Sequence, residues 1–344
     1  MALADAGLAV LLEGAVPFAL PLRRRFRDLD VREGVLIKGP HGWGEFAPFD
    51  DYTDAMAARW LGAAIEAAYG AWPAARRETV KVNAIIPAVT SGDAAVMARA
   101  AVLEQGCTTI KVKVGGSLTD DEARVAAVRD VLDTVLGRGV GQIRIDANAA
   151  WDVATATIAL RRLAAYGIEY VEQPCRDLSE LRELRSRIDV PVAVDEGIRM
   201  ADDPAGVRVA EVADLAVVKP APLGGVEATL RIVESLGVPV VVSGSLDSSV
   251  GLDVAIAAAA ALPDLPFACG FGTGALLAAD LTEATRVPHA GELRVERAAP
   301  DLDCLMAARD RIPDERAAWW RTRLALAWLA GADARSGDLV RAAT

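Results

Sequence analysis

Histidine and long apolar runs are scarce in this chain of 344 residues, and each shortage excludes a class of protein. Only His41 and His289 are present. Two histidines are too few for a His-rich zinc site, and they also argue against most Ser-His catalytic triads. The longest uninterrupted apolar run covers residues 254–262, whereas a membrane-spanning helix needs roughly 20 residues. We therefore expect neither a histidine-based zinc centre nor a membrane-spanning segment.

Basic residues are also in deficit, because 37 Lys and Arg stand against 48 Asp and Glu and give a net charge of -11. Binding to nucleic acid through its phosphates needs a basic face, so we exclude nucleic acid as a partner. The four cysteines form no Cys-x-x-Cys pair, and the first five residues hold no basic cluster of the kind that opens a secretory leader. We expect free thiols and a cytoplasmic protein without membrane association, and the sequence leaves the oligomeric state open.

Short β-branched runs alternate with amphipathic stretches between about residues 80 and 270. The runs begin every 20 to 33 residues, which is typical of consecutive βα units. Parallel strands joined by helical crossovers form either an open sheet or a closed barrel, and eight units favour the barrel. The predicted strands are Val80–Ile85, Thr109–Val114, Gln142–Asp146, Tyr170–Glu172, Val192–Asp195, Leu215–Lys219, Val240–Ser243 and Phe267–Cys269.

Several residues predict where the helices between these strands begin and end. Thr119 with Glu122 and Asp177 with Glu180 have the spacing of a capping box, in which two side chains satisfy free backbone amides. Gly137 is placed to end the first of these helices. Asp152 is predicted to begin the helix that lies between them, and Gly224-Gly225 to begin a later one.

The two ends of the chain differ from this central part. Leu8–Leu12 and Val31–Lys38 resemble strands, Asp54–Tyr69 is an alanine-rich helical run, and Gly291–Val295 resembles a further short strand before a helical tail. We predict that residues 1–79 and 285–344 pack together as an α+β capping domain beside a barrel of residues 80–284. The tryptophans of the tail are expected to pack in the core or at an interface.

Charged residues occur where the strands of a barrel are normally apolar. Lys111 and Lys113 stand two positions apart, so they share one face of their strand and point into the barrel, while Ile110 and Val112 face the helices. The next four strands each end in one charged residue, and in chain order these residues are Asp146, Glu172, Asp195 and Lys219. A single Asp at a strand end is usually a helix cap, and a single Lys is usually solvated, but five successive strands of this kind indicate a site.

The order of the strands suggests what this site holds. Lys113 and Lys219 come from the second and sixth strands and would face each other across the barrel mouth, where barrel active sites form. Asp146, Glu172 and Asp195 come from the three strands between them, and their mutual repulsion calls for a cation. Because all the ligands are oxygen atoms, the sequence predicts Mg²⁺, or Mn²⁺ as a second possibility.

A divalent ion between two amines suits proton abstraction from a small carboxylate substrate. The ion would stabilise the enediolate that forms when the α-proton leaves, and an amine would remove that proton. Free lysine, with a pKa near 10.4, is too often protonated for this role at neutral pH. The neighbouring Lys111 and the metal would both lower the pKa of Lys113 and make it a usable base.

These motifs resemble the muconate-lactonising branch of the enolase superfamily over almost the whole chain. The motifs in question are Lys111-x-Lys113, Asp146-x-Asn148, Glu172-Gln173-Pro174, Asp195-Glu196 and Lys219-Pro220. The resemblance implies a modified (β/α)₇β barrel with an α+β capping domain. It also implies that Lys113 is the acid/base group, tuned by Lys111, that Lys219 is the opposing lysine, and that Asp146, Glu172 and Asp195 bind magnesium.

Within this branch the chain most resembles the o-succinylbenzoate synthases of the actinobacterial type. Residues 32–48 and the segment Ser243–Gly251 carry that likeness. It implies dehydration of 2-succinyl-6-hydroxy-2,4-cyclohexadiene-1-carboxylate in menaquinone synthesis. Dipeptide epimerases of the branch have Asp-x-Asp where residues 269–274 have no acid, and N-succinylamino acid racemases often have Arg where this chain has Pro222.

The remaining features are less specific. We predict Ser243, Ser245, Gly270 and Gly272 as substrate-binding residues, with the glycine-rich segment either presenting backbone amides to an anion or forming a plain loop. Arg23–Arg27 falls where the family has a mobile loop, although solvated surface charge explains it equally simply. A Schiff-base aldolase and a barrel that only binds a carboxylate are the alternatives from other classes; neither needs both three converging acids and two opposed lysines.

Overall fold

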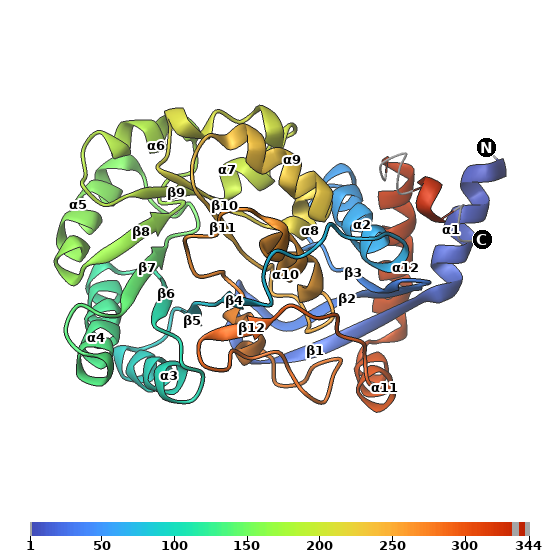
Figure 1. Cartoon of the computed structure of the whole chain (residues 1–344), viewed down its shortest axis with the longest axis horizontal. Coiled ribbons are helices and arrows are strands. Elements are labelled where there is room, and N and C mark those ends of the chain that lie inside the picture. Colours follow the sequence, from blue (N-terminus) through green and yellow to red (C-terminus); the bar gives the residue numbers. More distant parts are fainter. Residues whose placement is uncertain (1, 332–336, 341–344) are drawn as a thin grey trace.

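The computed structural model describes residues 2–331 and 337–340 and contains a barrel and a capping part (Figure 1). The barrel wall consists of seven parallel strands in the order β11-β10-β9-β8-β7-β6-β5. Their bounds are β5 Ala84–Ile86, β6 Thr109–Lys113, β7 Gln142–Asp146, β8 Ile168–Glu172, β9 Val192–Val194, β10 Leu215–Val218 and β11 Val240–Val242. The predicted α/β barrel is confirmed.

Two isolated bridges close the ring at the place of an eighth strand. Cys269 pairs in parallel with Val82, and Gly270 pairs in parallel with Ser243 at the end of β11. The amide of Gly270 donates to the carbonyl of Val242 over 2.8 Å, and the amide of Asn83 donates to that of Cys269 over 2.9 Å. The predicted strand Phe267–Cys269 is therefore reduced to single bridges that still complete the barrel.

The predicted strand Val80–Ile85 is wrong as one element. Its first half is β4 (Thr79–Lys81), which pairs antiparallel with β12 (Glu292–Arg294), and only β5 belongs to the barrel wall. The amide of Val82 donates to Gly291 over 2.9 Å, so the chain changes partner between the two halves. Local sequence pattern could not show this change because it does not reveal the strand with which each half pairs.

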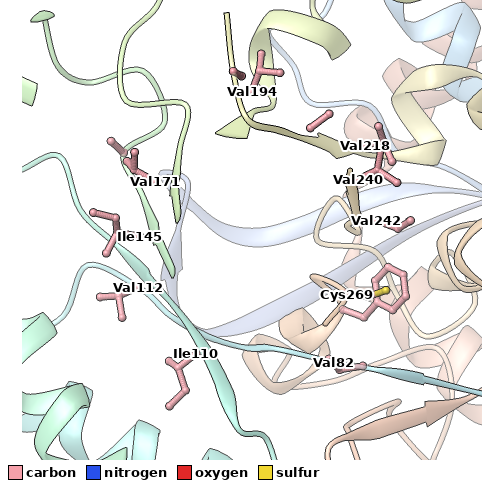
Figure 2. Close-up of a cluster of buried hydrophobic side chains, with 14 of the residues drawn as sticks. Val82, Ile110, Val112, Ile145, Val171, Val194, Val218, Val240, Val242 and Cys269 are labelled. Carbon is pink, nitrogen blue, oxygen red and sulfur yellow. The ribbon is translucent and has the colours of Figure 1, made fainter. Parts of the chain in front are cut away.

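Helices cover the outer face of the barrel (Figure 1). The side chains of alternate strand residues, including Ile110, Val112, Ile145 and Val171, form the buried layer between strands and helices (Figure 2). The outward position of Ile110 and Val112 confirms that Lys111 and Lys113 point inward. The helices here are α3 Ser91–Leu103, α4 Leu118–Leu136, α5 Val153–Leu163, α6 Leu178–Arg185, α7 Glu196–Arg199, α8 Pro220–Leu223, α9 Val226–Leu236 and α10 Leu252–Ala261, and the 3-10 helices are η1 Ala164–Tyr166, η2 Pro204–Gly206, η3 Val209–Glu211 and η4 Gly272–Leu276.

Most of the predicted helix ends are confirmed. Asp177 and Glu180 form the capping box of α6, the Asp152 side chain accepts the Thr155 amide at the start of α5, and Gly137 follows α4 with φ 101°. Gly225 precedes α9 as predicted. The capping box of Thr119 and Glu122 is wrong, because α4 already begins at Leu118.

The capping part is an antiparallel sheet covered by helices from both ends of the chain. Its strands β1 (Ala15–Phe26), β2 (Leu29–Gly39) and β3 (Gly42–Phe46) lie in sequence order, and α2 (Asp54–Tyr69) packs on β3. Two C-terminal helices, α11 (Leu302–Arg311) and α12 (Asp314–Leu329), pack on β1 and α2 respectively. Trp60 of α2 and Trp320 of α12 are fully buried in this core.

The predicted strand Leu8–Leu12 is wrong, since these residues lie inside helix α1 (Ala2–Gly14). Alanine and leucine are strong helix formers, and a short apolar run does not by itself distinguish a strand from a buried helix. Across the described residues, no helix combines the length and apolar character that spanning a membrane requires.

Candidate active site

A small cavity lies at the carboxyl ends of the barrel strands, where both parts of the chain contribute to its wall. The capping part supplies Phe26, Arg27, Phe49 and Tyr52. The barrel supplies the three lysines and the residues that follow β11 and the closing bridges. Its barrel lining consists of Asn83, Ile85, Lys111, Lys113, Arg199, Lys219, Ser243, Gly244, Ser245, Leu246, Gly270, Gly272 and Thr273.

Lys113 is buried at the end of β6 beside β7. Its Nζ donates to Asp146 Oδ2 over 2.5 Å and to Asn148 Oδ1 over 2.6 Å. Burial and, to a smaller extent, the neighbouring charge of Lys111 lower the pKa of Lys113, and they outweigh the attraction of Asp146. The resulting pKa is about 8. The predicted effect of Lys111 is thus present, but burial is the larger cause.

Lys111 differs from Lys113 although both lie on one face of one strand. Its Nζ donates to Glu172 Oε1 and Oε2 over 3.2 and 3.0 Å and lies 3.4 Å from Asp146 Oδ2. Burial disfavours its charge, but these two carboxylates dominate and hold the pKa of Lys111 above its ordinary value. Lys111 therefore stays protonated, and of these two lysines Lys113 is the one suited to accept a proton.

Lys219 follows β10, on the far side of the site from Lys113. It donates a hydrogen bond to Asp195 Oδ2, and Arg199 Nε of α7 donates to Asp195 Oδ1 over 3.0 Å. Burial, with the charges of Arg199 and Arg27, lowers the pKa of Lys219 against the attraction of Asp195. Asp195 has a pKa below its ordinary value, because Arg199 and Lys219 outweigh the effect of burial.

The three predicted acidic ligands have no exposed surface and follow one another round the barrel. Asp146 and Glu172 are register partners at the ends of β7 and β8, and Asp195 directly follows β9. Burial and the nearby Asp146 raise the pKa of Glu172 to about 6, whereas Lys113 and Lys111 outweigh burial and hold that of Asp146 below its ordinary range. Each acid forms an ion pair with a lysine.

Two segments of the chain match models of known protein domains. Residues 93–300 match the family described as enolase C-terminal domain-like, and residues 17–68 match enolase N-terminal domain-like. The chain belongs to the enolase superfamily. This family membership agrees with the barrel, the capping part and the order of the charged strand ends.

Relatives in actinobacteria are similar over nearly the full chain. The o-succinylbenzoate synthase of Thermobifida fusca is 49% identical over 313 residues, which cover 90% of this chain and 94% of the relative. The o-succinylbenzoate synthase of Mycobacterium tuberculosis strain H37Rv is 48% identical over 322 residues, covering 92% of this chain and 94% of the relative.

Solved structures of more distant enolase superfamily members share the fold. Muconate lactonizing enzyme from Pseudomonas fluorescens has a TM-score of 0.69 at 21% identity and covers 86% of this chain and 97% of that structure. A dipeptide epimerase from Enterococcus faecalis has a TM-score of 0.66 at 22% identity, with coverage of 83% and 96%. At these identities the likeness concerns the fold alone.

The superfamily barrel brings the four residues predicted to bind substrate, Ser243, Ser245, Gly270 and Gly272, to the cavity wall. Gly270 cannot present its amide to an anion as predicted, since that amide closes the barrel on Val242. A Cβ on Gly272 would lie 2.5 Å from the carbonyl oxygen of Asn83, so packing alone requires glycine there.

Of the arginines at 23–27, only Arg27 lies at the site. Arg23, Arg24 and Arg25 are exposed on β1, as solvated surface charge would be. Arg27 lies over the Phe49 ring, 5.2 Å from its centroid, and borders both the cavity and an adjoining cleft of about 850 Å³. Phe49, Tyr52 and Arg199 likewise border both the cavity and this cleft.

Sequence reasoning missed Tyr52, Asn83, Arg199 and Thr273, which all line the cavity. Arg199 carried a usable signal, because it stands four residues after Asp195 and so lies on the same side of helix α7. Its guanidinium also donates to the hydroxyl of Tyr52 and thereby joins barrel and capping part. Tyr52 carried no such signal, because it stands at least 94 residues before the predicted acidic ligands in the sequence.

Asp146, Glu172 and Asp195 can be compared with a magnesium site in their chemistry and placement. As the side chains stand, no three His, Cys, Asp or Glu residues of the described chain are grouped closely enough to hold one ion, because each acid is turned to its lysine. All the donors are carboxylate oxygens on three neighbouring strands, however, which is the ligand type that Mg²⁺ selects. In ligand type and in strand placement the donor set therefore fits magnesium.

Proposed function

We propose that this enzyme is an o-succinylbenzoate synthase. It removes water from 2-succinyl-6-hydroxy-2,4-cyclohexadiene-1-carboxylate to form o-succinylbenzoate, a step of menaquinone synthesis. The observation that carries the proposal is the 48–49% identity with synthases over at least 90% of the chain. The geometry supports it, because the cavity lining has five cationic side chains and, among the described residues, no carboxylate, as a dianionic substrate requires.

Lys113 is the group that moves the proton. With a pKa near 8, about a tenth of Lys113 is neutral at pH 7 and can accept the proton from C1 of the substrate ring. The same ammonium then returns a proton to the departing C6 hydroxyl, which leaves as water while the ring becomes aromatic. One base on one face suffices for both steps, so the elimination is syn.

Lys219 and Lys111 act through charge. Lys219 lies across the cavity from Lys113 and stabilises the negative charge that develops on the substrate carboxylate when the C1 proton leaves. Lys111 stays protonated, keeps Glu172 in place and disfavours the charge of Lys113. Of the two buried amines on β6, one therefore transfers the proton and the other keeps its positive charge.

Magnesium, with manganese as a second possibility, would be held by Asp146, Glu172 and Asp195. Bound there, the ion would supply Lewis-acid stabilisation of the enediolate charge. The three lysines already neutralise the three acids, so the added charge of a divalent ion is matched by the two carboxylates of the substrate. Ion and substrate are thus expected to bind in a mutually dependent way.

The sister activities of the branch lack support in the residues present. Between the end of the barrel at Cys269 and Asp280 there is no acid to hold a substrate ammonium. Asp280 itself accepts hydrogen bonds from the amide and hydroxyl of Ser249 over 3.1 and 2.5 Å, so it is already used within the protein. Pro222, where racemases often have arginine, is buried in α8.

The test is a turnover assay of the purified protein with the cyclohexadiene carboxylate, an N-succinylamino acid and L-Ala-L-Glu, each with Mg²⁺ and with excess chelator. We expect rapid dehydration that chelator abolishes, and slower or no racemisation and epimerisation. Turnover that persists in chelator would contradict the metal assignment. Trapping of substrate by borohydride would instead indicate a Schiff-base aldolase, and binding without turnover would indicate a carboxylate-binding barrel.

A further inference from the structure

The hydroxyl of Thr273 is buried without a hydrogen-bond partner. Thr273 is 7% exposed, and its Oγ1 forms no hydrogen bond with any residue that the structure describes. The buried hydroxyls of Thr157 and Thr229 are satisfied by the carbonyls four residues earlier, over 2.6 and 2.7 Å. Because an unpaired buried hydroxyl is unfavourable, a group of this kind in a cavity wall points to a ligand that pairs with it.

The position of Thr273 indicates which part of a ligand it meets. It lies in η4, just after the residues that take the eighth place in the barrel ring. The eighth place is opposite the fourth, which is β8 with Glu172, and the three acids come from the third, fourth and fifth places. A substrate whose ring carboxylate is bound on the side of the acids therefore extends its other end towards Thr273.

The chemistry of the surrounding wall agrees with this direction. The neutral residues Asn83 and Ser243 pack against Gly272 and Gly270, which stand just before Thr273, while the cavity lining as a whole contains five cationic side chains. The Ser243 hydroxyl already has the carbonyl of Gly270 within 3.2 Å, and the amide of Gly270 is used by Val242. Thr273 is thus a donor that the protein itself does not use on this side.

We infer that the Thr273 hydroxyl donates a hydrogen bond to the terminal carboxylate of the succinyl chain and is a specificity-determining residue. This inference rests on the proposed synthase function. Thr273 is assigned no part in proton transfer, which belongs to Lys113 in the proposed reaction. Removing its hydroxyl should weaken binding of ligands with that carboxylate and leave other steps unchanged.

The test compares Thr273→Val, which keeps the shape and removes the hydroxyl, with wild type and Thr273→Ser. Calorimetry with Mg²⁺ present measures two ligands: the product o-succinylbenzoate, and 2-butyrylbenzoate, in which a methyl group replaces the terminal carboxylate. We expect Thr273→Val to raise the Kd of the product by about 10- to 100-fold, the effect of a hydrogen bond to a charged group. The Kd of 2-butyrylbenzoate should not change, and Thr273→Ser should resemble wild type.

Stability and kinetics separate this role from a structural one. Since Thr273 has no partner to lose, Thr273→Val should keep or raise the Tm, whereas the control Thr157→Val should lower the Tm and leave both Kd values unchanged. In turnover, KM should rise about as much as Kd with little change in kcat. Thr273→Ala serves as a second hydroxyl-free variant should the valine fit poorly.

The outcomes are distinguishable. Equal product affinity of wild type and Thr273→Val, or an equal loss for both ligands, would overturn the inference while wild-type turnover still supported the synthase. A wild-type protein that turns over none of the cyclohexadiene substrate would overturn the proposed function itself, and with it the assignment of a succinyl carboxylate to Thr273.

Discussion

At the scale of single residues, the unequal environments of two lysines on one strand carry the mechanism. Lys113 and Lys111 lie two positions apart, yet Lys111 contacts two carboxylates and keeps its proton, while burial makes Lys113 the easier one to deprotonate. The difference arises from which acid each amine reaches across the barrel. Of these two lysines, it supports Lys113 as the base of the proposed reaction.

Lys113→Ala and Lys113→Arg should both lose at least about 10⁴-fold in kcat. The rate contribution of a group that serves two steps should lie at or beyond the top of the usual range for acid–base residues. Arginine cannot replace Lys113, because a guanidinium does not give up its proton near neutrality. Lys219→Arg, which keeps the positive charge, should retain a trace of activity. Steady-state turnover checks this, with the exposed Lys38→Ala as control; a Lys113→Ala enzyme of near-normal rate would remove Lys113 from the mechanism.

Asp195→Asn should abolish the response to magnesium. One of three ligand charges is lost, so metal affinity should fall by more than the roughly 10- to 100-fold that an outer-shell partner is worth. The variant should also unfold at lower temperature, because Lys219 and Arg199 lose a buried partner.

The measurement for Asp195→Asn is therefore the rise in Tm on adding Mg²⁺, made separately for each variant. Asp214→Asn is the matched control, since Asp214 pairs with Arg185 outside the cavity. A normal Mg²⁺-induced rise in the Asp195→Asn protein would show that Asp195 is not a ligand.

At the scale of elements, close backbone approach holds α2 against the capping sheet. A Cβ on Gly44 of β3 would lie 1.9 Å from the carbonyl oxygen of Ala64 in α2. This oxygen belongs to the backbone, so a change of side-chain conformation cannot remove the clash. Glycine at this position lets the helix approach the strand, and the buried Trp60 and Leu61 of α2 then complete the core. The position of Tyr52 and Phe49, just before α2, depends on that contact.

Gly44→Ala should reduce the free energy of unfolding by roughly 1–3 kcal/mol or more, as overpacking does. Urea unfolding measures the loss. Gly92→Ala in α3 is the matched control, since its Cβ would meet nothing closer than 4.0 Å and alanine favours the helix. Equal stability of the Gly44→Ala and Gly92→Ala proteins would contradict the close approach.

At the scale of the whole molecule, Asp253 ties the barrel to the segment that leads into the C-terminal helices. This residue of α10 is 3% exposed and accepts the amide of Ala298 over 2.7 Å. Arg286 Nη1 lies 3.0 Å from its Oδ1 but without hydrogen-bond alignment. Burial raises the pKa of Asp253 to about 7 in spite of that arginine.

The raised pKa predicts a pH-dependent stability. Between about pH 4 and pH 7 the unfolded chain loses the Asp253 proton while the folded protein retains it, so stability falls as pH rises and is constant above pH 7. Asp253→Asn keeps an acceptor for Ala298 and has no such dependence. The Tm of Asp253→Asn minus the Tm of wild type should therefore increase from pH 5 to pH 8.

Thermal unfolding at pH 5, 6.5 and 8 checks this, with the exposed Asp264→Asn as control. A Tm difference between Asp253→Asn and wild type that stays constant, or that moves in favour of wild type at high pH, would show that Asp253 is ionised in the folded protein and paired with Arg286.

The sequence by itself determined the features that depend on neighbouring residues. The two-residue period of β6 places Lys111 and Lys113 inside the barrel and Ile110 and Val112 outside, and the capping box at Asp177 and the glycine at 137 set helix ends, because strand alternation and capping are local. The order of acids and lysines along the strands likewise follows from the chain.

Tertiary structure alone decided the contacts between segments far apart in sequence. The split of β4 from β5, the helix at Leu8–Leu12 and the meeting of Arg199 with Tyr52 depend on partners that no local pattern names. The unpaired hydroxyl of Thr273 is of the same kind. A threonine shows in sequence that it can donate a hydrogen bond, but only the packed barrel shows that nothing in the protein accepts it, because that depends on every neighbour at once.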